Sequence, residues 1–336
     1  MDWTKSYSAE WRVYRVNRKT WADAERVANV DSVSVTRTAD GSLLESGGIS
    51  VTGELPSDYY RIVMTAEQGG DVQRVDVATL LFDVTGGEHN YGTQVQEADG
   101  FSVLYPASTT VVLAGEYAPS GVDGAKYAAD LLEQTINAPV EVEGGFTLND
   151  HVVHEIGSTV LEAVWAVLDA GGYIIQIDGR GVVHIRPKPT EPALVLDNSS
   201  MRLLGNGIKY TNDVSEIPNR YIVLVNSSKT IATNNDENSS VSVVNRGYCV
   251  DEVDESPTPI DGETLAGYAN RKLHELSTLY DEREYTREYA DGVYLYSIVK
   301  ASINGLTGDY RVTSQSIDCG HGIQVSEKAV REVNLW

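Results

Sequence analysis

The sequence of 336 residues exceeds one typical domain and can bury a large core, so it predicts two or three domains. Its 49 acidic and 26 basic residues give a formal net charge of −23, which argues against a surface that grips nucleic-acid phosphates. The N-terminus is polar where a secretory signal would be apolar, and no run of about 18 apolar residues is free of charge, so we expect a soluble protein made in a cytoplasm.

The first part of the chain carries many short strand patterns separated by turn residues. The earliest strand is expected near residues 10–17, and hairpins are expected at 31–52 and 60–81. The second hairpin contains Gln-Gly-Gly-Asp at 68–71, which is typical of a tight turn. Closely spaced strands of this kind are typical of a barrel or a sandwich, and we predict an N-terminal β domain over residues 1–118.

Residues 160–187 predict a helix followed directly by a hairpin. Leu161, Trp165 and Leu168 recur on one helical face, so we expect them to pack the interior of a small module. Replacement of Trp165 with alanine should then cost about 3–5 kcal/mol. Together with a helical pattern from about residue 123, this segment predicts an α/β helix-hairpin domain over residues 119–190.

Three prolines between residues 187 and 192 mark a stiff linker and a domain boundary. Beyond it we predict a second β domain over residues 191–336, with a helix inserted at about 262–280 and capped by Asp261. The strand patterns of this domain lie at residues 207–210, 220–226, 294–300 and 309–317. The polar stretch at 227–240 is expected to be a long exposed hairpin or a partly mobile loop, and the acidic stretch at 251–263 is expected to be a loop.

No group of residues in the sequence predicts catalysis. His151 and His154 are three residues apart and lack the His-Glu-x-x-His order of a zinc-protease helix. The carboxylates at 251–255 lie in a proline-bearing loop, where burial of a glycosidase acid is not expected. Cys249 and Cys319 show no metal or redox spacing, so free thiols are favoured over a disulfide. We therefore predict no enzyme activity, no catalytic residue, no cofactor and no bound metal.

Four segments, in this order along the chain, resemble the baseplate hub, or tail hub, proteins of long-tailed bacteriophages and contractile injection systems. The first is similar to their opening strands, the second to their helix-hairpin insert, the third to the strand and turn that reopen the second β domain, and the fourth to their closing strands. The segments are SVSVTRTADGSLLESGGISV (32–51), STVLEAVWAVLDAGGYIIQIDGRGVVHIRP (158–187), GIKYTNDVSEIPNRYIVL (207–224) and LTGDYRVTSQSIDCGHG (306–322).

The resemblance implies an α+β, mainly β fold with two tail-tube-like β-barrel domains and smaller α/β insert elements. It implies a structural virion protein of the tail tip or baseplate, assembled in the bacterial host cytoplasm. Three copies would form a homotrimeric ring that joins the sixfold tail tube to the threefold tip and lines the channel for genome ejection. The implied partners are further copies of the chain, a distal tail or tail-tube protein, the tape-measure protein and a tip or spike protein, with DNA only in transit.

The resemblance also gives the acidic residues a use, because a negative channel wall would let the genome or the tape-measure protein slide. The candidates for the lumen or for contacts between subunits are Asp236, Glu237, Asp251, Glu252, Asp254 and Glu255. Since the chain ends at Trp336, soon after the last predicted strand, we expect cell-wall cutting and host recognition to belong to a separate tip protein. The alternatives are a distal tail ring subunit, a carbohydrate-binding adhesin, or a hydrolase that uses the acidic residues or the two histidines.

Overall fold

The computed structural model describes residues 5–90, 93–113, 116–197, 203–225, 228–260, 262–303, 305–320 and 324–336. The chain divides into two compact units, which are described separately. The large unit comprises Met1–Ile208 and Glu284–Ala329, and the small unit comprises Lys209–Arg283 and Val330–Trp336. This division follows packing contacts, and the predicted boundaries at residues 118 and 190 stay a prediction.

The fold is mainly β, as predicted, and most strands belong to one sheet of 13 strands in the order β14-β18-β21-β20-β3-β4-β7-β6-β5-β1-β2, with β19 beside β20 and β13 beside β19. The N-terminal strands are β1 (Ser8–Val16), β2 (Asp23–Arg26), β3 (Val30–Thr38), β4 (Glu45–Thr52), β5 (Asp58–Gln68), β6 (Asp71–Asn90) and β7 (Thr93–Phe101). The C-terminal strands are β13 (Pro192–Asp197), β14 (Leu203–Thr211), β18 (Thr278–Glu288), β19 (Ile298–Ile303), β20 (Leu306–Asp318) and β21 (Gln324–Asn334).

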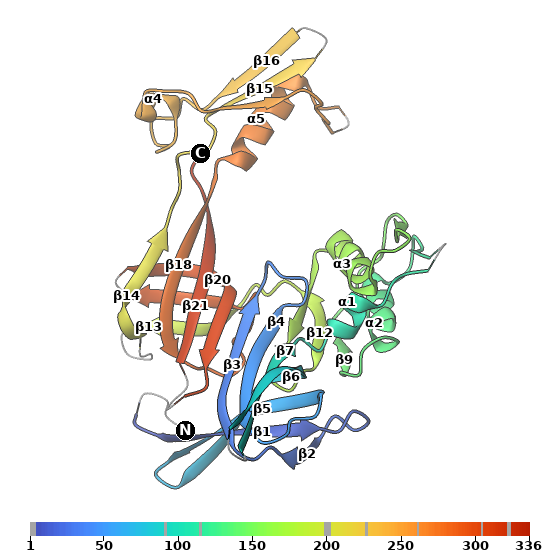
Figure 1. The fold of residues 1–336 in the computed structure, drawn as a ribbon. Helices are drawn as coiled ribbons and strands as arrows, with labels where there is room; N and C mark the ends of the chain where they lie inside the picture. Colours follow the sequence, from blue (N-terminus) through green and yellow to red (C-terminus); the bar gives the residue numbers. More distant parts are fainter. Residues whose placement is uncertain are drawn as a thin grey trace. The chain divides into compact units, whose positions relative to one another are not determined.

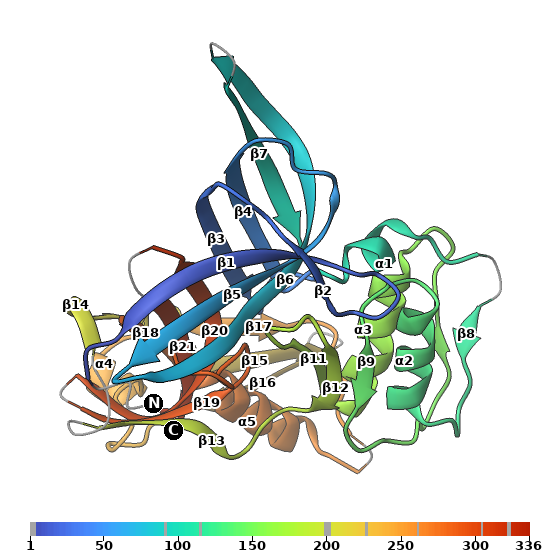
Figure 2. The same ribbon diagram turned by 90° about the horizontal axis from the view of Figure 1, so that it is seen from below.

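Two long strands each take part in two layers of the large unit. β6 pairs with β5 through its first half and with β7 through its second half, and that second half forms a hairpin that projects from the unit (Figure 2). β20 pairs with β19 near its start and with β3 near its end, so the β20–β3 pairing joins the two ends of the chain (Figure 1). Among the described strands the pairings run as an open series, and no closed barrel is formed.

Strand β3 shows why the sheet has one buried and one exposed face. Its sequence alternates, so Val33 and Val35 point into the core while Ser32, Ser34 and Thr36 point away from it. The buried side chains pack with apolar residues of β4, β5, β6 and β20, including Ile49, Ile62, Leu80, Phe82 and Ile317. Because of this alternation, the side chains on one face of β3 are buried in the core, and those on the other face are exposed.

A buried polar network lies at the junction of the N-terminal and C-terminal strands. The Arg37 guanidinium donates to Glu45 at 2.6 Å, to the Gln315 side-chain oxygen at 3.0 Å and to the carbonyl of Val77. Burial lowers the pKa of Arg37, but the charge of Glu45, the hydrogen bond to Glu45 and the nearby Tyr289 and Tyr294 together leave the pKa above its ordinary value. The network ties β3 to β4, β6 and β20.

Gln315 extends this network toward the C-terminal strands. Its amide nitrogen donates to Glu327 at 2.7 Å and to the carbonyl of Val293 at 3.0 Å. Glu327 in turn accepts two hydrogen bonds from Arg287, and both side chains of this ion pair are fully buried. Two cations and two anions are thus enclosed together, with a neutral amide between the pairs.

The helical module of the large unit packs around its own apolar core. It contains the helices α1 (Tyr105–Thr109), α2 (Gly124–Glu133) and α3 (Val160–Gly171), and the strands β8 (Tyr117–Ala118), β9 (Val140–Val142), β10 (Val152–Val153), β11 (Tyr173–Ile177) and β12 (Val183–Pro187). Thr159 and Glu162 form a capping box at the start of α3, and Gly172 ends the helix with a φ of 67°. Figure 1 shows the helices gathered beside β9 and β12.

The three side chains expected to pack this module differ in burial. Leu161 and Leu168 are enclosed in the core, whereas Trp165 is half-buried at its edge. The indole nitrogen of Trp165 donates to the carbonyl of Ser42 at 3.2 Å, so the ring bridges the module and the β3–β4 loop. Its truncation is therefore expected to cost less than the value that full burial implies.

The turn of the β11–β12 hairpin docks directly on the sheet. A Cβ atom at Gly179 would lie 1.7 Å from the carbonyl oxygen of Asp76, so only glycine allows this approach. The indole of Trp21 donates to the Arg180 carbonyl at 2.8 Å, and the buried Arg61 guanidinium donates to the same oxygen at 3.1 Å. These contacts fix the module against β5 and β6.

The small unit is a three-stranded sheet covered on one face by a helix. Its elements are β15 (Arg220–Val225), β16 (Ser228–Thr233), α4 (Val243–Arg246), β17 (Asp251–Asp254) and α5 (Leu265–Leu276). Tyr221 and Val223 of β15 pack against Tyr268 and Leu273 of α5. Thr264 caps α5, whereas the predicted cap, Asp261, lies outside the described residues. No helix in the described ranges is long and apolar enough to span a membrane.

Replacement of Glu327 with glutamine should lower the free energy of unfolding by about 3–5 kcal/mol, because it leaves the buried charge of Arg287 unpaired. The double replacement Arg287→Met with Glu327→Leu should recover most of that loss, since it removes both charges. Urea unfolding followed by tryptophan fluorescence measures both. As a control, Glu10→Gln changes a surface pair with Arg12 and should leave the midpoint unchanged; an equal loss there would contradict this account.

Candidate functional site

The uncovered face of the main sheet carries small hydroxyl and acidic side chains in cross-strand rows. The central row crosses β20, β3, β4, β7 and β6 through Asp318, Ser34, Gly48, Asp99 and Asp83. One row beside it contains Ser316, Thr36 and Ser46 and ends at the half-buried Phe101 and Leu81. The row on the other side contains Ser32, Ser50 and Glu97. We call the five residues of the central row and the six polar residues of these two rows the polar face.

The polar face is negatively charged. Its side chains are serines, one threonine, one glycine and the four carboxylates of Asp83, Glu97, Asp99 and Asp318, and no lysine or arginine stands among them. The four carboxylate residues are exposed. Short hydroxyl side chains offer little apolar area for adhesion, and like charge repels nucleic-acid phosphates. Such a surface suits passage of a polyanion better than capture of one.

The acidic residues predicted as site residues lie in the small unit. Asp251 forms a two-pronged ion pair with Arg220, at 2.6 and 2.5 Å, across the β15–β17 pairing. Asp254 accepts hydrogen bonds from the hydroxyls of Tyr268 at 2.7 Å and Tyr221 at 3.0 Å. These two carboxylates therefore have structural partners inside the unit.

The remaining four predicted acids are exposed, and one of them shapes a loop. Asp236 accepts from the backbone nitrogen of Asn238 at 2.8 Å, and Glu237, Glu252 and Glu255 present their side chains to solvent. Their predicted role in a lumen or subunit interface stays a prediction. Asp251, Glu252 and Asp254 lie on strand β17, so the prediction of a loop at these residues is wrong, because they pair with β15. Asp236 and Glu237 lie in the loop after β16.

Sequence reasoning missed the polar face, although part of its signal was visible. Residues 32–36 read Ser-Val-Ser-Val-Thr, which alternates small polar and β-branched residues. The rows themselves depend on pairings between segments far apart in the sequence, such as Asp318 with Ser34. These pairings could not be derived from a local pattern.

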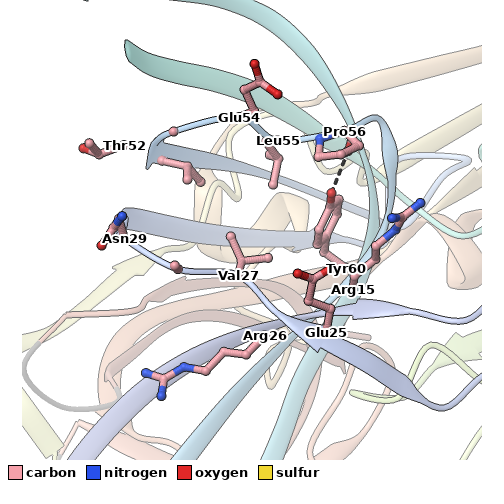
Figure 3. Close-up of a pocket in the computed structure, with 13 residues that line it drawn as sticks. Arg15, Glu25, Arg26, Val27, Asn29, Thr52, Glu54, Leu55, Pro56 and Tyr60 are labelled. Atoms are coloured by element: carbon pink, nitrogen blue, oxygen red, sulfur yellow. Dashed lines mark hydrogen bonds between the residues drawn. The ribbon is translucent and has the colours of Figure 1, made fainter. Parts of the chain in front are cut away.

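A pocket of about 390 Å³ lies between the β2–β3 turn and the β4–β5 loop (Figure 3). Val27, Leu55 and Tyr60 lie around it, and Glu54 points outward. The Tyr60 hydroxyl donates to the carbonyl of Pro56 at 2.7 Å, which holds the loop closed over the ring. Two carboxylates, Glu25 and Glu54, and two guanidiniums, Arg15 and Arg26, also line the pocket. The Arg15 guanidinium donates to Asp58 at 2.6 Å.

The two histidines weighed as a metal pair lie in different environments. His151 is exposed beside the ring of Tyr117, whereas His154 is buried with its Nε2 atom 3.3 Å from the Tyr127 hydroxyl. Burial lowers the pKa of His154, which keeps the imidazole neutral near pH 7. Within the described ranges no three His, Cys, Asp or Glu side chains are placed to hold a metal ion. Both cysteines are free, as predicted.

Comparisons with solved structures find this fold in tail proteins. No family model matches the sequence, and no curated protein matches it. The 43 kDa tail protein of prophage MuSo2 from Shewanella oneidensis has a TM-score of 0.62 at 13% identity, over 96% of this chain and 98% of that one. The tail protein from Neisseria meningitidis MC58 has a TM-score of 0.59 at 12% identity, over 97% of both chains. The chain has a phage-tail-type fold.

A chain of the lidded PdpA-VgrG complex from Francisella is also similar. Its TM-score is 0.56 at 8% identity, and the match covers 97% of this chain but 53% of that one. At these identities the likeness concerns the fold. The predicted resemblance to tail proteins is thus confirmed at the level of the fold, while assignment to the hub in particular stays a proposal.

His184 supplies a pH-dependent prediction for the β11–β12 hairpin. A hydrogen bond to Asp178 at 3.4 Å, with the nearby charges of Glu141 and Glu143, raises the pKa of His184. Its stabilising contribution should be complete below about pH 6.5 and should be lost as the pH rises through the raised value. The difference in melting temperature between wild type and His184→Gln should therefore be largest at acid pH and shrink above neutrality. If His151→Gln showed the same dependence of melting temperature on pH, the interaction of His184 with Asp178 would not be its cause.

Asp254 and Glu255 are adjacent acids with different expected roles in the small unit. Asp254→Ala removes the acceptor of two tyrosine hydroxyls and should cost about 1 kcal/mol or more. Glu255→Ala, its matched control, should leave the melting temperature unchanged. Calorimetry on the two variants measures the difference, and equal melting temperatures would show that the Asp254 contacts do not stabilise the unit.

Proposed function

We propose that this chain is a structural virion protein, the hub of a phage tail or baseplate. Three copies form a ring that joins the sixfold tail tube to the threefold tip and encloses the channel for the genome and the tape-measure protein. The full-length fold likeness to two tail proteins supports this function. The single observation that carries it is the polar face, an acidic surface of the main sheet.

The strand order explains how such a ring closes. The described pairings of the main sheet end at three edge strands, β14, β13 and β2, and an edge strand can pair with a further strand. We propose that the regions around β6 and β20 are two tube-like halves, since each contains a long strand shared between two layers. Each half supplies strands to a barrel that is completed by the other copies, which is consistent with the open pairing of the described strands of one chain.

In this ring the polar face lines the channel. Hydroxyl and carboxylate side chains offer no cation to the phosphates of passing DNA, so the channel wall does not retain the DNA. The exposed acids of the small unit, Asp236, Glu237, Glu252 and Glu255, are proposed to serve contacts between subunits or the lumen. The expected neighbours are a distal tail or tail-tube protein, the tape-measure protein and a tip or spike protein, all within the virion tail.

The mass of the purified protein in solution tests the assembly. Light scattering over a concentration series should give three copies, and images of the same sample should show rings with an open centre. A monomer at every concentration, together with affinity for sugars, would favour an adhesin and contradict the ring.

A charge reversal tests the channel wall. Rings that carry Ser34→Lys with Asp99→Lys should retain a short DNA duplex at low salt, and added salt should release it. The wild type should retain none. The matched control, Ser120→Lys with Asp150→Lys, makes the same change of charge at exposed positions of the helical module. Equal retention by both variants would contradict a lumen formed by the polar face.

A further inference from the structure

A cluster of exposed apolar side chains lies on the helical module of the large unit, apart from the polar face. Tyr117 and Val153 face each other across the β8–β10 pair, with 52% and 62% of their surface exposed. Ile156, three residues after Val153, is 76% exposed. These side chains line a hollow of about 650 Å³ together with His151, His154, Glu116 and Glu155. Single exposed apolar residues are common, but a hollow lined by several of them marks an interaction site.

The apolar surface continues on the other side of the same loop. A second hollow, of about 630 Å³, is lined by residues 153–158 and by Glu162, Ala163 and Ala166 of α3. Ile156 borders both hollows, so it forms a ridge between them. The core of the module is complete beneath this surface, since Ala118 and Leu161 are already buried. The exposed side chains are therefore not needed for packing within the chain.

The rim of this surface is acidic. Glu116 and Glu155 border the first hollow, and Glu162 borders the second, while no lysine or arginine lines either. The Glu162 carboxylate accepts from the Thr159 backbone at 2.7 Å and is committed to the helix cap. Glu116 and Glu155 are the exposed charges, and neutral His154 beneath them adds no positive charge at pH 7. A ligand that covers the hollows must offer apolar side chains flanked by cations.

We propose that this acidic-rimmed apolar patch docks a segment of a partner protein that carries apolar side chains next to lysine or arginine. A twofold contact of the patch with its own copy fits poorly, because it would place Glu116 and Glu155 against the same residues of the second copy. Nucleic acid and anionic membrane surfaces are repelled by the same carboxylates. The inference does not depend on the channel, so it can hold or fail independently of the proposed hub.

Binding of a synthetic probe tests the patch. A dye-labelled amphipathic helical peptide of leucine and lysine should bind the full-length protein saturably in fluorescence anisotropy, and salt should weaken the binding. The matched leucine–glutamate peptide should bind at least tenfold more weakly. Val153→Ser with Ile156→Ser should lower the affinity for the leucine–lysine peptide at least tenfold. Absence of binding by that peptide to the wild type would overturn the proposal.

Matched variants distinguish binding of the leucine–lysine peptide at the patch from its nonspecific attraction to an acidic protein. Val72→Ser with Val84→Ser removes two other exposed valines of the large unit and should leave the affinity unchanged. Glu116→Gln with Glu155→Gln should weaken binding and flatten its salt dependence, whereas Glu237→Gln with Glu252→Gln should not. The proposal would be overturned if the two serine double variants lost equal affinity for the leucine–lysine peptide, or if the two glutamine double variants did. Circular dichroism of each variant confirms that these surface changes leave the fold intact.

Discussion

The large unit depends on one buried arrangement of charges at the junction of its N-terminal and C-terminal strands. Arg37 with Glu45 and Arg287 with Glu327 form two enclosed ion pairs, and the Gln315 amide connects them. Burial of four charges raises the free energy of the folded state unless each charge has its partner. Only the arrangement of strands that pairs all four charges is therefore stable. We infer that it fixes the register in which β20 meets β3, although the chain between them is some 280 residues long.

That register determines what the outer face of the sheet presents. Because side chains alternate along each strand, inward placement of Arg37 and Gln315 forces Thr36 and Ser316 outward on the same row. A slip of one residue would turn valines outward and bury serines. The polar face is thus a consequence of the buried network, and the proposed channel wall rests on a constraint in the core. The helical module adds a separate surface, which is apolar within an acidic rim.

Local patterns predicted the mainly β fold, the start of α3 and its end at the glycine pair, because periodicity and capping depend on neighbouring residues. The half-burial of Trp165 was not predictable, since its face of α3 meets the β3–β4 loop, more than 100 residues away. The helix α5 ends at Leu276, short of the predicted 280, because Leu279 belongs to β18. Arg37 occupies a core position in an alternating strand, and its distant partners could not be derived from the sequence around it.

The central claim is that the polar face lines the opening of a ring, and site-specific labelling tests it most directly. In a background with Cys249→Ser and Cys319→Ala, Ser34→Cys on the polar face can be coupled to a small gold cluster and the particles imaged. The account predicts gold at the centre of each ring, and a label at Val153→Cys should appear at the periphery. Gold from position 34 on the outer rim, or particles without a central opening, would contradict it.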